Sequence, residues 1–186
     1  IYTLPTIYAV TGGGNYCAGG VGVNVGLGGS STAVNYQLYN GAIAVGSVLS
    51  GTGAPLNFGL KTAAGTYTVV ATDAATSCVS NMASSASIVV TPLVTPAVTM
   101  TTATTSEICA GSTVTYTTSV VNGGTTPAYQ WYVNGTSTGV TASAYSYAPI
   151  DADSLSVMLT SDVACVTTAT ATASMIIDVL PNVLPY

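Results

Sequence analysis

Apolar and polar residues alternate along much of the chain with a period of two, the pattern of β-strands that bury one face. The alternation is clearest in Thr66–Thr72 and Ser154–Ser161, where every second side chain is apolar. No segment combines the 3.6-residue period of an amphipathic helix with capping residues. Clusters of Gly and Asn, as at Gly12–Asn15 and Asn122–Thr125, separate the alternating runs. The pattern predicts an all-β fold.

Six strands are predicted in each half of the chain. In the first half they span Ile7–Thr11, Val21–Leu27, Val34–Tyr39, Leu56–Leu60, Thr66–Thr72 and Ser84–Thr91. In the second half they span Ala97–Thr101, Thr113–Val121, Ala128–Val133, Ala144–Ala148, Ser154–Ser161 and Thr168–Val179. Short strands with turn signals between them favour antiparallel β-sandwiches of the immunoglobulin-like type, which need about 100 residues each.

The two halves are repeats of one unit, with a period of about 92 residues. Four landmarks recur in the same order: a Cys-Ala-Gly sequence, a Tyr-Gln pair followed by Asn-Gly, an alternating strand that ends near Asp, and a second Cys-Val. They begin at Cys17, Tyr36, Tyr67 and Cys78, and again at Cys109, Tyr129, Leu155 and Cys165. A fixed period over this length predicts two tandem domains, 1–92 and 93–186.

Proline-containing segments mark the junction and both ends of the sequence. The junction Thr91–Pro96 contains two prolines, and Leu4–Val10 and Asp178–Tyr186 have a similar composition. We expect either a slice of a longer array or a subunit whose ends contact the next subunit. The apolar tail Val179–Tyr186 is a candidate strand donor to a neighbour's sheet edge. Candidate subunit contacts near the ends are Tyr2, Tyr8, Val183, Leu184 and Tyr186.

The order of the landmarks resembles a known group of repeats. Cys-x-Gly before a strand, Tyr-x-Trp with Asn-Gly soon after, and an alternating strand followed by Asp and a second Cys resemble the immunoglobulin-like and polycystic-kidney-disease-like repeats of secreted surface proteins in the Bacteroidota. The first unit departs from the pattern with Leu38 in place of Trp, and the second with Leu155 in place of Tyr. The resemblance implies secretion, rigid spacing and adhesion, and it implies no catalysis.

Three aromatic residues, one on the third predicted strand of the first unit and two on that of the second, are candidate core anchors. A Trp at this place in a sandwich normally packs between the two sheets. We therefore expect Trp131, with Tyr36 and Tyr129 at the start of the same motif, to be buried rather than to form a sugar-binding platform.

The four cysteines are candidates for disulfide bonds in an oxidising compartment. There is no Cys-x-x-Cys pair and no His, which argues against a zinc site or a catalytic thiol. One bridge per domain, Cys17–Cys78 and Cys109–Cys165, is the default pairing. In an immunoglobulin sandwich, however, the second and sixth strands run the same way, and the first Cys of each unit precedes the second strand while the other Cys follows the sixth. The two should therefore lie at opposite ends of the sandwich, about 20 Å or more apart. The alternative is Cys17–Cys165 across the junction with Cys109 joined to Cys78 of the next subunit, and free thiols are a third reading.

Charge is scarce, with one Lys, no Arg and six acidic residues giving a net charge of −5. Nucleic acid and anionic membrane surfaces are excluded as partners, because both need clustered basic residues. No apolar run approaches the roughly 20 residues of a membrane-spanning helix, so no membrane insertion is expected. A surface this poor in charge is either wetted by Thr, Ser and Asn or largely covered in an assembly.

No constellation for catalysis is present in the sequence. Without His, neither Ser-His-Asp nor Cys-His chemistry can occur. Asp151 and Asp153 are interpreted as a turn before a strand, with a weak calcium site as the alternative. Gly12–Gly14 lacks the Lys of a phosphate loop and is interpreted as a turn. We expect no enzyme activity, no cofactor and no metal.

Two positions fit short glycosylation signals. Asn134 begins an Asn-Gly-Thr sequence, which also fits a hairpin turn, and Ser154 follows Asp153 in a signal used by secreted Bacteroidota proteins.

Together these patterns predict a secreted, extracellular or cell-surface structural protein that polymerises head to tail with copies of itself. The alternative is an adhesin or a carbohydrate-binding spacer of a larger secreted protein, with a glycan or surface ligand as its partner.

Overall fold

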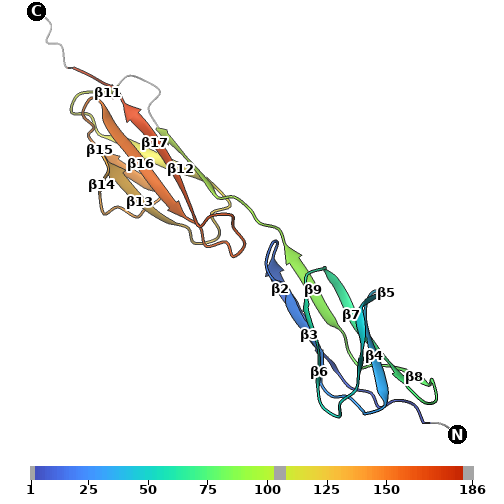
Figure 1. The fold of residues 1–186 in the computed structure, drawn as a ribbon. Coiled ribbons are helices and arrows are strands. Elements are labelled where there is room, and N and C mark those ends of the chain that lie inside the picture. The colour runs from blue at the N-terminus through green and yellow to red at the C-terminus, as the bar shows by residue number, and fades with distance from the viewer. Residues whose placement is uncertain (1–2, 103–107, 182–186) are drawn as a thin grey trace, which may run out of the picture. The chain divides into compact units, whose positions relative to one another are not determined.

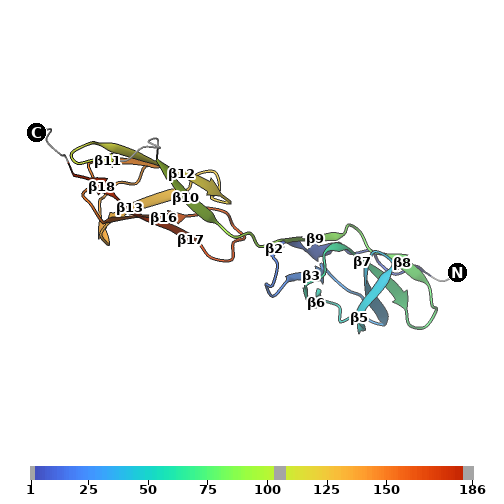
Figure 2. The ribbon, with the colours of Figure 1, turned by 90° about the horizontal axis from the view of Figure 1, so that it is seen from above.

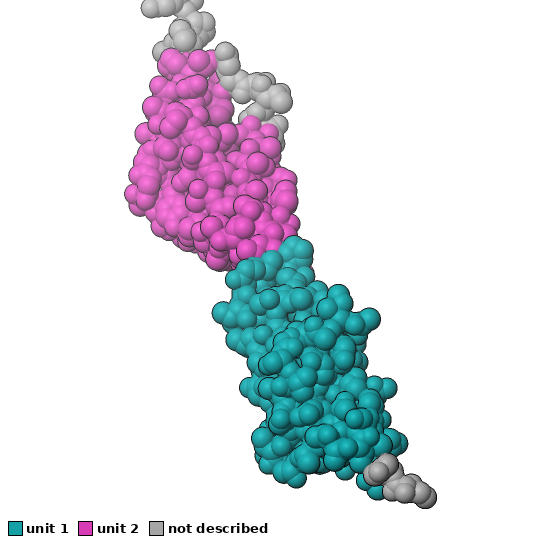
Figure 3. Space-filling view, turned by 45° about the vertical axis from the view of Figure 1, so that its right-hand side comes forward, with its two compact units in different colours: residues 1–92 teal, residues 93–186 magenta. Residues whose placement is uncertain are grey.

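The computed structural model describes residues 3–102 and 108–181, and every regular element in them is a β-strand. The chain divides into two compact units, residues 1–92 and 93–186, which Figure 3 distinguishes by colour. Each unit is an antiparallel β-sandwich with its own core, so the protein is all-β with two tandem sandwich domains.

Unit 1 contains two sheets, visible in Figures 1 and 2. The smaller sheet has the order β1 (Val10–Gly12), β3 (Val23–Leu27), β6 (Leu56–Lys61). The larger sheet has the order β2 (Gly14–Cys17), β9 (Ala86–Thr91), β7 (Gly65–Asp73), β4 (Val34–Asn40), β5 (Ile43–Ser50), with β8 (Val79–Asn81) paired to β7.

Unit 2 repeats this arrangement. One sheet has the order β10 (Ala97–Thr102), β12 (Val114–Val121), β15 (Ala144–Tyr147), and the facing sheet has the order β14 (Thr136–Ser137), β13 (Ala128–Val133), β16 (Asp153–Thr160), β17 (Thr170–Ile177). β11 (Ile108–Cys109) and β18 (Val179–Leu180) form a short, separate parallel pair.

The first strand of each sandwich crosses from one sheet to the other. In unit 1, β1 pairs antiparallel with β3, and β2 then runs parallel to the last strand, β9. In unit 2, β10 pairs with β12, and β11 runs parallel to β18. The second strand of each unit therefore lies parallel to its last strand, a topological feature that the sequence pattern did not predict.

Glycine makes the crossing in unit 1 possible. Gly12 and Gly13 have φ of +88° and +82°, a region that L-residues avoid. A Cβ on Gly13 would lie 2.6 Å from the backbone oxygen of Ser87, and one on Gly12 would lie 2.1 Å from that of Asn24. The predicted turn at this position is thus a strand crossing that only glycine permits.

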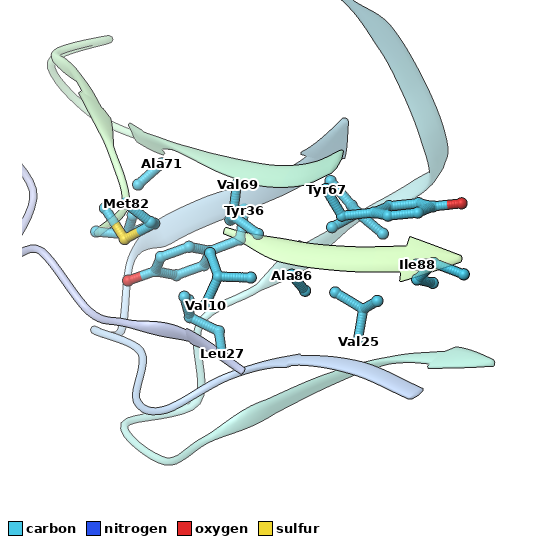
Figure 4. Packing of buried hydrophobic residues seen from close by; sticks show 12 residues of the cluster. Val10, Val25, Leu27, Tyr36, Tyr67, Val69, Ala71, Met82, Ala86 and Ile88 are labelled. Carbon is cyan, nitrogen blue, oxygen red and sulfur yellow. The ribbon is translucent and has the colours of Figure 1, made fainter. Parts of the chain in front are cut away.

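The core of unit 1 lies between the two sheets (Figure 4). Tyr36 and Leu38 of β4 and Tyr67 of β7 are almost wholly buried, and Tyr36 and Tyr67 lie on the side of the larger sheet that faces Val25 and Leu27 of β3. Full burial of an aromatic or branched side chain contributes about 1.5–3 kcal/mol, so these few residues supply much of the stability of the unit.

The core of unit 2 is centred on Trp131, which is completely buried. Its indole Nε1 donates a hydrogen bond to the Ala142 carbonyl at 2.9 Å, so burying the ring leaves no polar group unsatisfied. The Tyr145 ring lies 5.7 Å from that of Trp131 and stacks on Tyr147 at 5.1 Å. Of the other candidate anchors, Tyr36 is fully buried and Tyr129 is half-buried. No ring of this core forms an exposed platform around Trp131.

Candidate functional site

The cysteines of unit 1 lie at opposite ends of the sandwich. Cys17 is the last residue of β2 and pairs with Thr91, the last residue of β9, so it marks the end at which the chain leaves the unit, here called the exit end. Cys78 precedes β8, and its carbonyl accepts a hydrogen bond from the Asp73 backbone N–H at 2.9 Å. β8 lies at the end where the chain enters the unit, here called the entry end (Figures 1 and 2), and the nearby residue Ala83 bridges to Ala9.

The cysteines of unit 2 occupy the same two kinds of position. Cys109 pairs with Leu180 in β18 and lies at the exit end. The Cys165 carbonyl accepts a hydrogen bond from the Val94 N–H at 3.0 Å, and Val94 bridges to Val166, which places Cys165 at the entry end. Each unit thus has one exit-end and one entry-end cysteine.

The default prediction of one disulfide within each domain is wrong. Cys78 and Cys109 are free thiols, so neither Cys17–Cys78 nor Cys109–Cys165 exists. The reason is distance: the nine residues of β7 alone span about 30 Å, and a disulfide needs Cα atoms within about 7 Å.

Cys17 and Cys165 form the disulfide bond of this chain. Backbone pairing within each unit explains why they can meet. Cys17 pairs with Thr91, and Cys165 is hydrogen-bonded to Val94. Thr91 and Val94 are three residues apart, a separation of at most about 11 Å. Of the alternatives left open by the sequence, the first half of the cross-junction pairing is the one observed.

The Cys-Ala-Gly motif forms the same tight turn at both exit ends. The Gly20 N–H donates to the Cys17 carbonyl at 3.0 Å, and the Ser112 N–H donates to the Cys109 carbonyl at 3.1 Å. The third residue of each turn, Gly19 or Gly111, has φ near +84°, which a β-turn of this kind requires of glycine.

Backbone hydrogen bonds anchor both turns to the last strand of their units. The Ala18 N–H donates to the Thr91 carbonyl at 2.8 Å, and the Ala110 N–H donates to the Leu180 carbonyl at 3.0 Å. Cys109 is therefore held in the same local geometry as the bonded Cys17.

A carboxylate shapes the turn before Cys78. Asp73 Oδ1 accepts hydrogen bonds from the backbone N–H groups of Ala75 and Thr76 and from the Thr76 hydroxyl. The backbone hydrogen bond from Thr76 and the one from its hydroxyl hold the pKa of Asp73 below its ordinary value. The sequence analysis used this Asp as a repeat landmark, but its role in positioning the cysteine turn was not predicted.

Asp162 in unit 2 also accepts several hydrogen bonds from a nearby loop. Its Oδ2 accepts hydrogen bonds from the hydroxyl and backbone N–H of Thr126, at 2.7 and 3.0 Å, and from the Thr125 hydroxyl. The Thr126 hydroxyl hydrogen bond is the main reason that the pKa of Asp162 is lowered. Through these hydrogen bonds Asp162 joins the loop before β13 to the end of β16.

Exposed apolar side chains lie near both free thiols. At the entry end of unit 1, Val79 follows Cys78 directly and is 52% exposed, and Ile7 precedes the residues that pair with Ala83. At the exit end of unit 2, Leu180 pairs with Cys109, and Ile176 is 65% exposed on the last full strand. Both ends thus offer apolar surface next to a thiol that can react.

Asp151 and Asp153 form a structural turn. Asp153 is buried, and its carboxylate accepts hydrogen bonds from the Asn134 amide at 2.7 Å and from the Ile150 N–H at 3.0 Å. Asp151 accepts one from the Val179 N–H. Protein donors therefore use these oxygens, which agrees with the turn reading. No group of three or more His, Cys, Asp or Glu that could hold a metal occurs within residues 3–102 and 108–181.

Burial affects two tyrosines beside this turn. Burial first, and then the charge of Asp153, raises the pKa of Tyr147 and that of Tyr116. The Tyr147 hydroxyl lies 3.4 Å from Asp153 Oδ2. The Tyr116 hydroxyl is buried without a hydrogen-bond partner.

The two glycosylation candidates lie on the hairpin and strand beside the same turn. Asn134 and Gly135 both have positive φ and connect β13 to β14, the geometry of an Asn-Gly hairpin turn. The Asn134 amide donates to Asp153, and its oxygen accepts from the Ser154 N–H at 2.9 Å. Ser154 is half-buried in β16. The Asn134 side chain thus has a structural role.

The candidate subunit contacts are described only in part. Tyr2, Val183, Leu184 and Tyr186 lie outside the described residues. Tyr8 is half-buried against the core of unit 1, and its hydroxyl lies 3.0 Å from Ser31 Oγ. Val179 and Leu180, which begin the predicted donor tail, pair with β11 of their own unit.

In the part of the chain that the structure covers, no helix has the length and apolar character needed to cross a membrane.

No known family profile matches the chain, and no curated protein does either. Several solved structures share the class of fold. Fibronectin(III)-like modules of CbhA from Clostridium thermocellum align at a TM-score of 0.37 with 19% identity, over 94% of this chain and 95% of that one. The ectodomain of mouse nectin-like molecule 4 aligns at 0.40 with 13% identity, over 97% and 67%.

The N-terminal four Ig domains of Dscam1 isoform 6.9 align at 0.38 with 12% identity, over 79% of this chain, which spans 37% of that structure. These similarities concern the β-sandwich alone, and the functional argument below depends on the site.

Proposed function

We propose that this protein is an extracellular structural subunit of a filament or surface array, which assembles head to tail through the ends of its units. The observation that carries the proposal is the placement of the cysteines. Each unit has one cysteine at its entry end and one at its exit end, and the exit-end Cys17 is bonded to the entry-end Cys165. A chain fastened at the ends of its units suits a load-bearing role.

The strand order within each unit supports a mechanical role. The intact Cys17–Cys165 disulfide carries the tension past β9 and β11, which lie in the loop that it closes. Once the disulfide is reduced, pulling the two chain ends apart slides β2 against β9 and β11 against β18, because each pair is parallel. The hydrogen bonds of each pair are then loaded together in shear instead of one after another. In unit 1 this pairing runs over four residues, from Gly14 opposite Ile88 to Cys17 opposite Thr91.

An oxidising location is part of the proposal. Stable disulfides form outside the cytosol, and the chain contains one. The low charge gives copies of the chain little mutual repulsion, which favours self-association.

The test is self-association of the purified chain under oxidising conditions. Analytical ultracentrifugation over a hundredfold concentration range should show species that grow in steps of one chain, and electron microscopy should show unbranched filaments. A single monomeric species at every concentration would contradict the proposal and favour the alternative, an adhesin or carbohydrate-binding spacer of a larger protein. Binding to a glycan array would then test that alternative.

A further inference from the structure

The observed disulfide joins two kinds of cysteine, and the two remaining cysteines are one of each kind. It joins an exit-end cysteine, Cys17, to the entry-end cysteine of the following unit, Cys165. The free thiols are the complementary pair: Cys109 at the exit end of unit 2 and Cys78 at the entry end of unit 1. A second copy whose unit 1 is placed after unit 2 of the first would bring its Cys78 to Cys109 in the same order.

We propose that Cys109 of one copy forms a disulfide with Cys78 of the next, so that head-to-tail assembly becomes covalent. This inference rests on the proposed function and specifies its bond. It would make every junction in the filament chemically equivalent, with the same two kinds of cysteine at each.

The local geometry of Cys109 supports the equivalence. The hydrogen bonds that hold its turn match those of the bonded Cys17 to within about 0.2 Å, both in the turn itself and in the anchor to the last strand. Cys109 is also exposed, so its sulfur is open to reaction.

Cys78 is equivalent to Cys165 in the repeat, and each is followed by Val. Cys78 is partly exposed, and its turn is held by the Asp73 carboxylate and by a hydrogen bond from its own N–H to the Thr76 hydroxyl at 3.3 Å. The thiol is thus presented at the entry end on a defined turn. The neighbouring exposed side chain of Val79, and that of Leu180 beside Cys109, provide apolar surface for a second copy to cover.

Forming this bond requires a two-electron oxidant, which we specify as a small-molecule or protein disulfide. The Cys109 thiolate attacks one sulfur of the oxidant, forming a mixed disulfide and releasing one thiolate. The Cys78 thiolate of the next copy then attacks the Cys109 sulfur and releases the second thiolate. Two protein thiols are oxidised to one disulfide, the oxidant is reduced to two thiols, and the two protons pass to the released thiolates.

The experiment uses the 186-residue chain with oxidised glutathione as the oxidant. Wild-type protein should give a non-reducing gel ladder with a spacing of one chain, 18.4 kDa, that collapses to a single band on reduction. A mixture of ¹⁴N- and ¹⁵N-labelled protein should yield linked peptides that contain Cys78 from one isotope and Cys109 from the other.

Two single variants form the matched control. On the non-reducing gel C78S and C109S should each run as a single chain, because each lacks one of the two complementary cysteines. A mixture of the two should give a dimer and nothing larger, since only the Cys109 of C78S can bond to the Cys78 of C109S. Cys17–Cys165 stays intact in all of these proteins, so loss of the ladder does not reflect loss of the internal disulfide.

Two results would overturn the inference. Single variants that dimerise as readily as the mixture would show unspecific oxidation of exposed thiols. Cys78–Cys109 peptides with no mixed-isotope species among them would show closure within one chain. The proposed function is tested separately by ultracentrifugation of C78S/C109S. If the double variant forms filaments while the wild type gives no ladder, assembly stands and the covalent bond does not. Monomers in both measurements would end both proposals.

Discussion

At the scale of residues, the two cores place their large aromatic side chain on different strands. Unit 1 has Leu38 and Tyr67 where unit 2 has Trp131 and Leu155, and all four side chains are buried. Leu38 pairs with Val69 in β7, two residues from Tyr67, so the exchanged side chains are close on the same inner face. The large side chain has moved from one strand to the next while the core stays filled.

This exchange predicts strong coupling between the two positions in unit 1. Leu38→Trp alone should cost about 1–3 kcal/mol by overpacking. Tyr67→Leu alone should cost about 2 kcal/mol, because it leaves a cavity and removes the hydrogen bond from the Tyr67 hydroxyl to the Ala63 carbonyl. The double variant should cost about 1 kcal/mol less than the sum, as measured by calorimetric unfolding. Additive costs would mean that the two sites do not share space.

The acid limit of stability should depend on Asp162. Its folded-state pKa is lowered, chiefly by the Thr126 hydroxyl, so its contribution is complete above the ordinary carboxyl pKa of about 3.9 and is lost as the pH falls through the folded value. With no His in the chain, the melting temperature should change little between pH 5 and 8 and fall below about pH 4.

Asp162→Asn should lower the melting temperature at pH 7 and flatten the acid fall. Asp178→Asn removes the same charge from an exposed position and is the control. If the melting temperatures of the two variants depended equally on pH between pH 2 and 7, the Thr126 hydrogen bonds would have no role in acid stability.

At the scale of elements, the crossing between β1 and β2 sets the parallel pairing and the position of Cys17. Gly13→Ala should cost more than the roughly 1–2 kcal/mol of a left-handed backbone alone, because the new Cβ would overlap the Ser87 oxygen. Gly19→Ala is the control, since Gly19 has φ of +83° but open space around its Cβ position. Urea unfolding should show a difference of at least about 1 kcal/mol between the two variants. Equal costs would mean that strand β9 yields to the new methyl group.

All twelve predicted strands have counterparts, with changes at some boundaries. The predicted Ile7–Thr11 begins as a strand only at Val10, and the predicted Thr168–Val179 divides at Asp178. These strands were found because each has a buried face that leaves an alternating pattern. The strands that were missed, β2, β5, β8, β11, β14 and β18, are either very short or exposed at an edge, where no burial imposes such a pattern.

The longest missed strand, β5, illustrates this limit. It is the edge of the larger sheet in unit 1, and its residues Ile43 and Val48 are 73% and 51% exposed. Gly46 has φ of +69°, and the pairing with β4 shifts register between Tyr36 and Leu38. An irregular, exposed edge strand therefore leaves no periodic pattern in the sequence. A bulge of this kind also protects the edge from unwanted pairing with another strand.

The sequence was enough to predict at which end of its sandwich each cysteine lies, but not which cysteines pair. The order of strands and cysteines correctly indicated opposite ends of each sandwich. Choosing between the pairings required the backbone register, because only the pairing of Cys17 with Thr91 and of Cys165 with Val94 brings those two sulfurs within reach.

At the scale of the whole molecule, the disulfide closes a covalent loop that contains residues 18–164. When the two chain ends are pulled apart, the covalent path runs through residues 1–17, the disulfide and residues 165–186. Single-molecule pulling under oxidising conditions should therefore give a fully extended length about 500 Å shorter than after reduction. Equal lengths in the two conditions would show that the disulfide is absent in solution.

The same loop contains Lys61, the only Lys or Arg of the chain, at the end of β6. Cleavage by trypsin after Lys61 would give fragments 1–61 and 62–186, and Cys17 lies in the first and Cys165 in the second. Both fragments should run as one band on a non-reducing gel and separate on reduction, whereas two bands without reductant would contradict the disulfide. A cut anywhere in the loop leaves the chain in one covalent piece, so a material built from this protein would tolerate proteolytic damage without losing continuity.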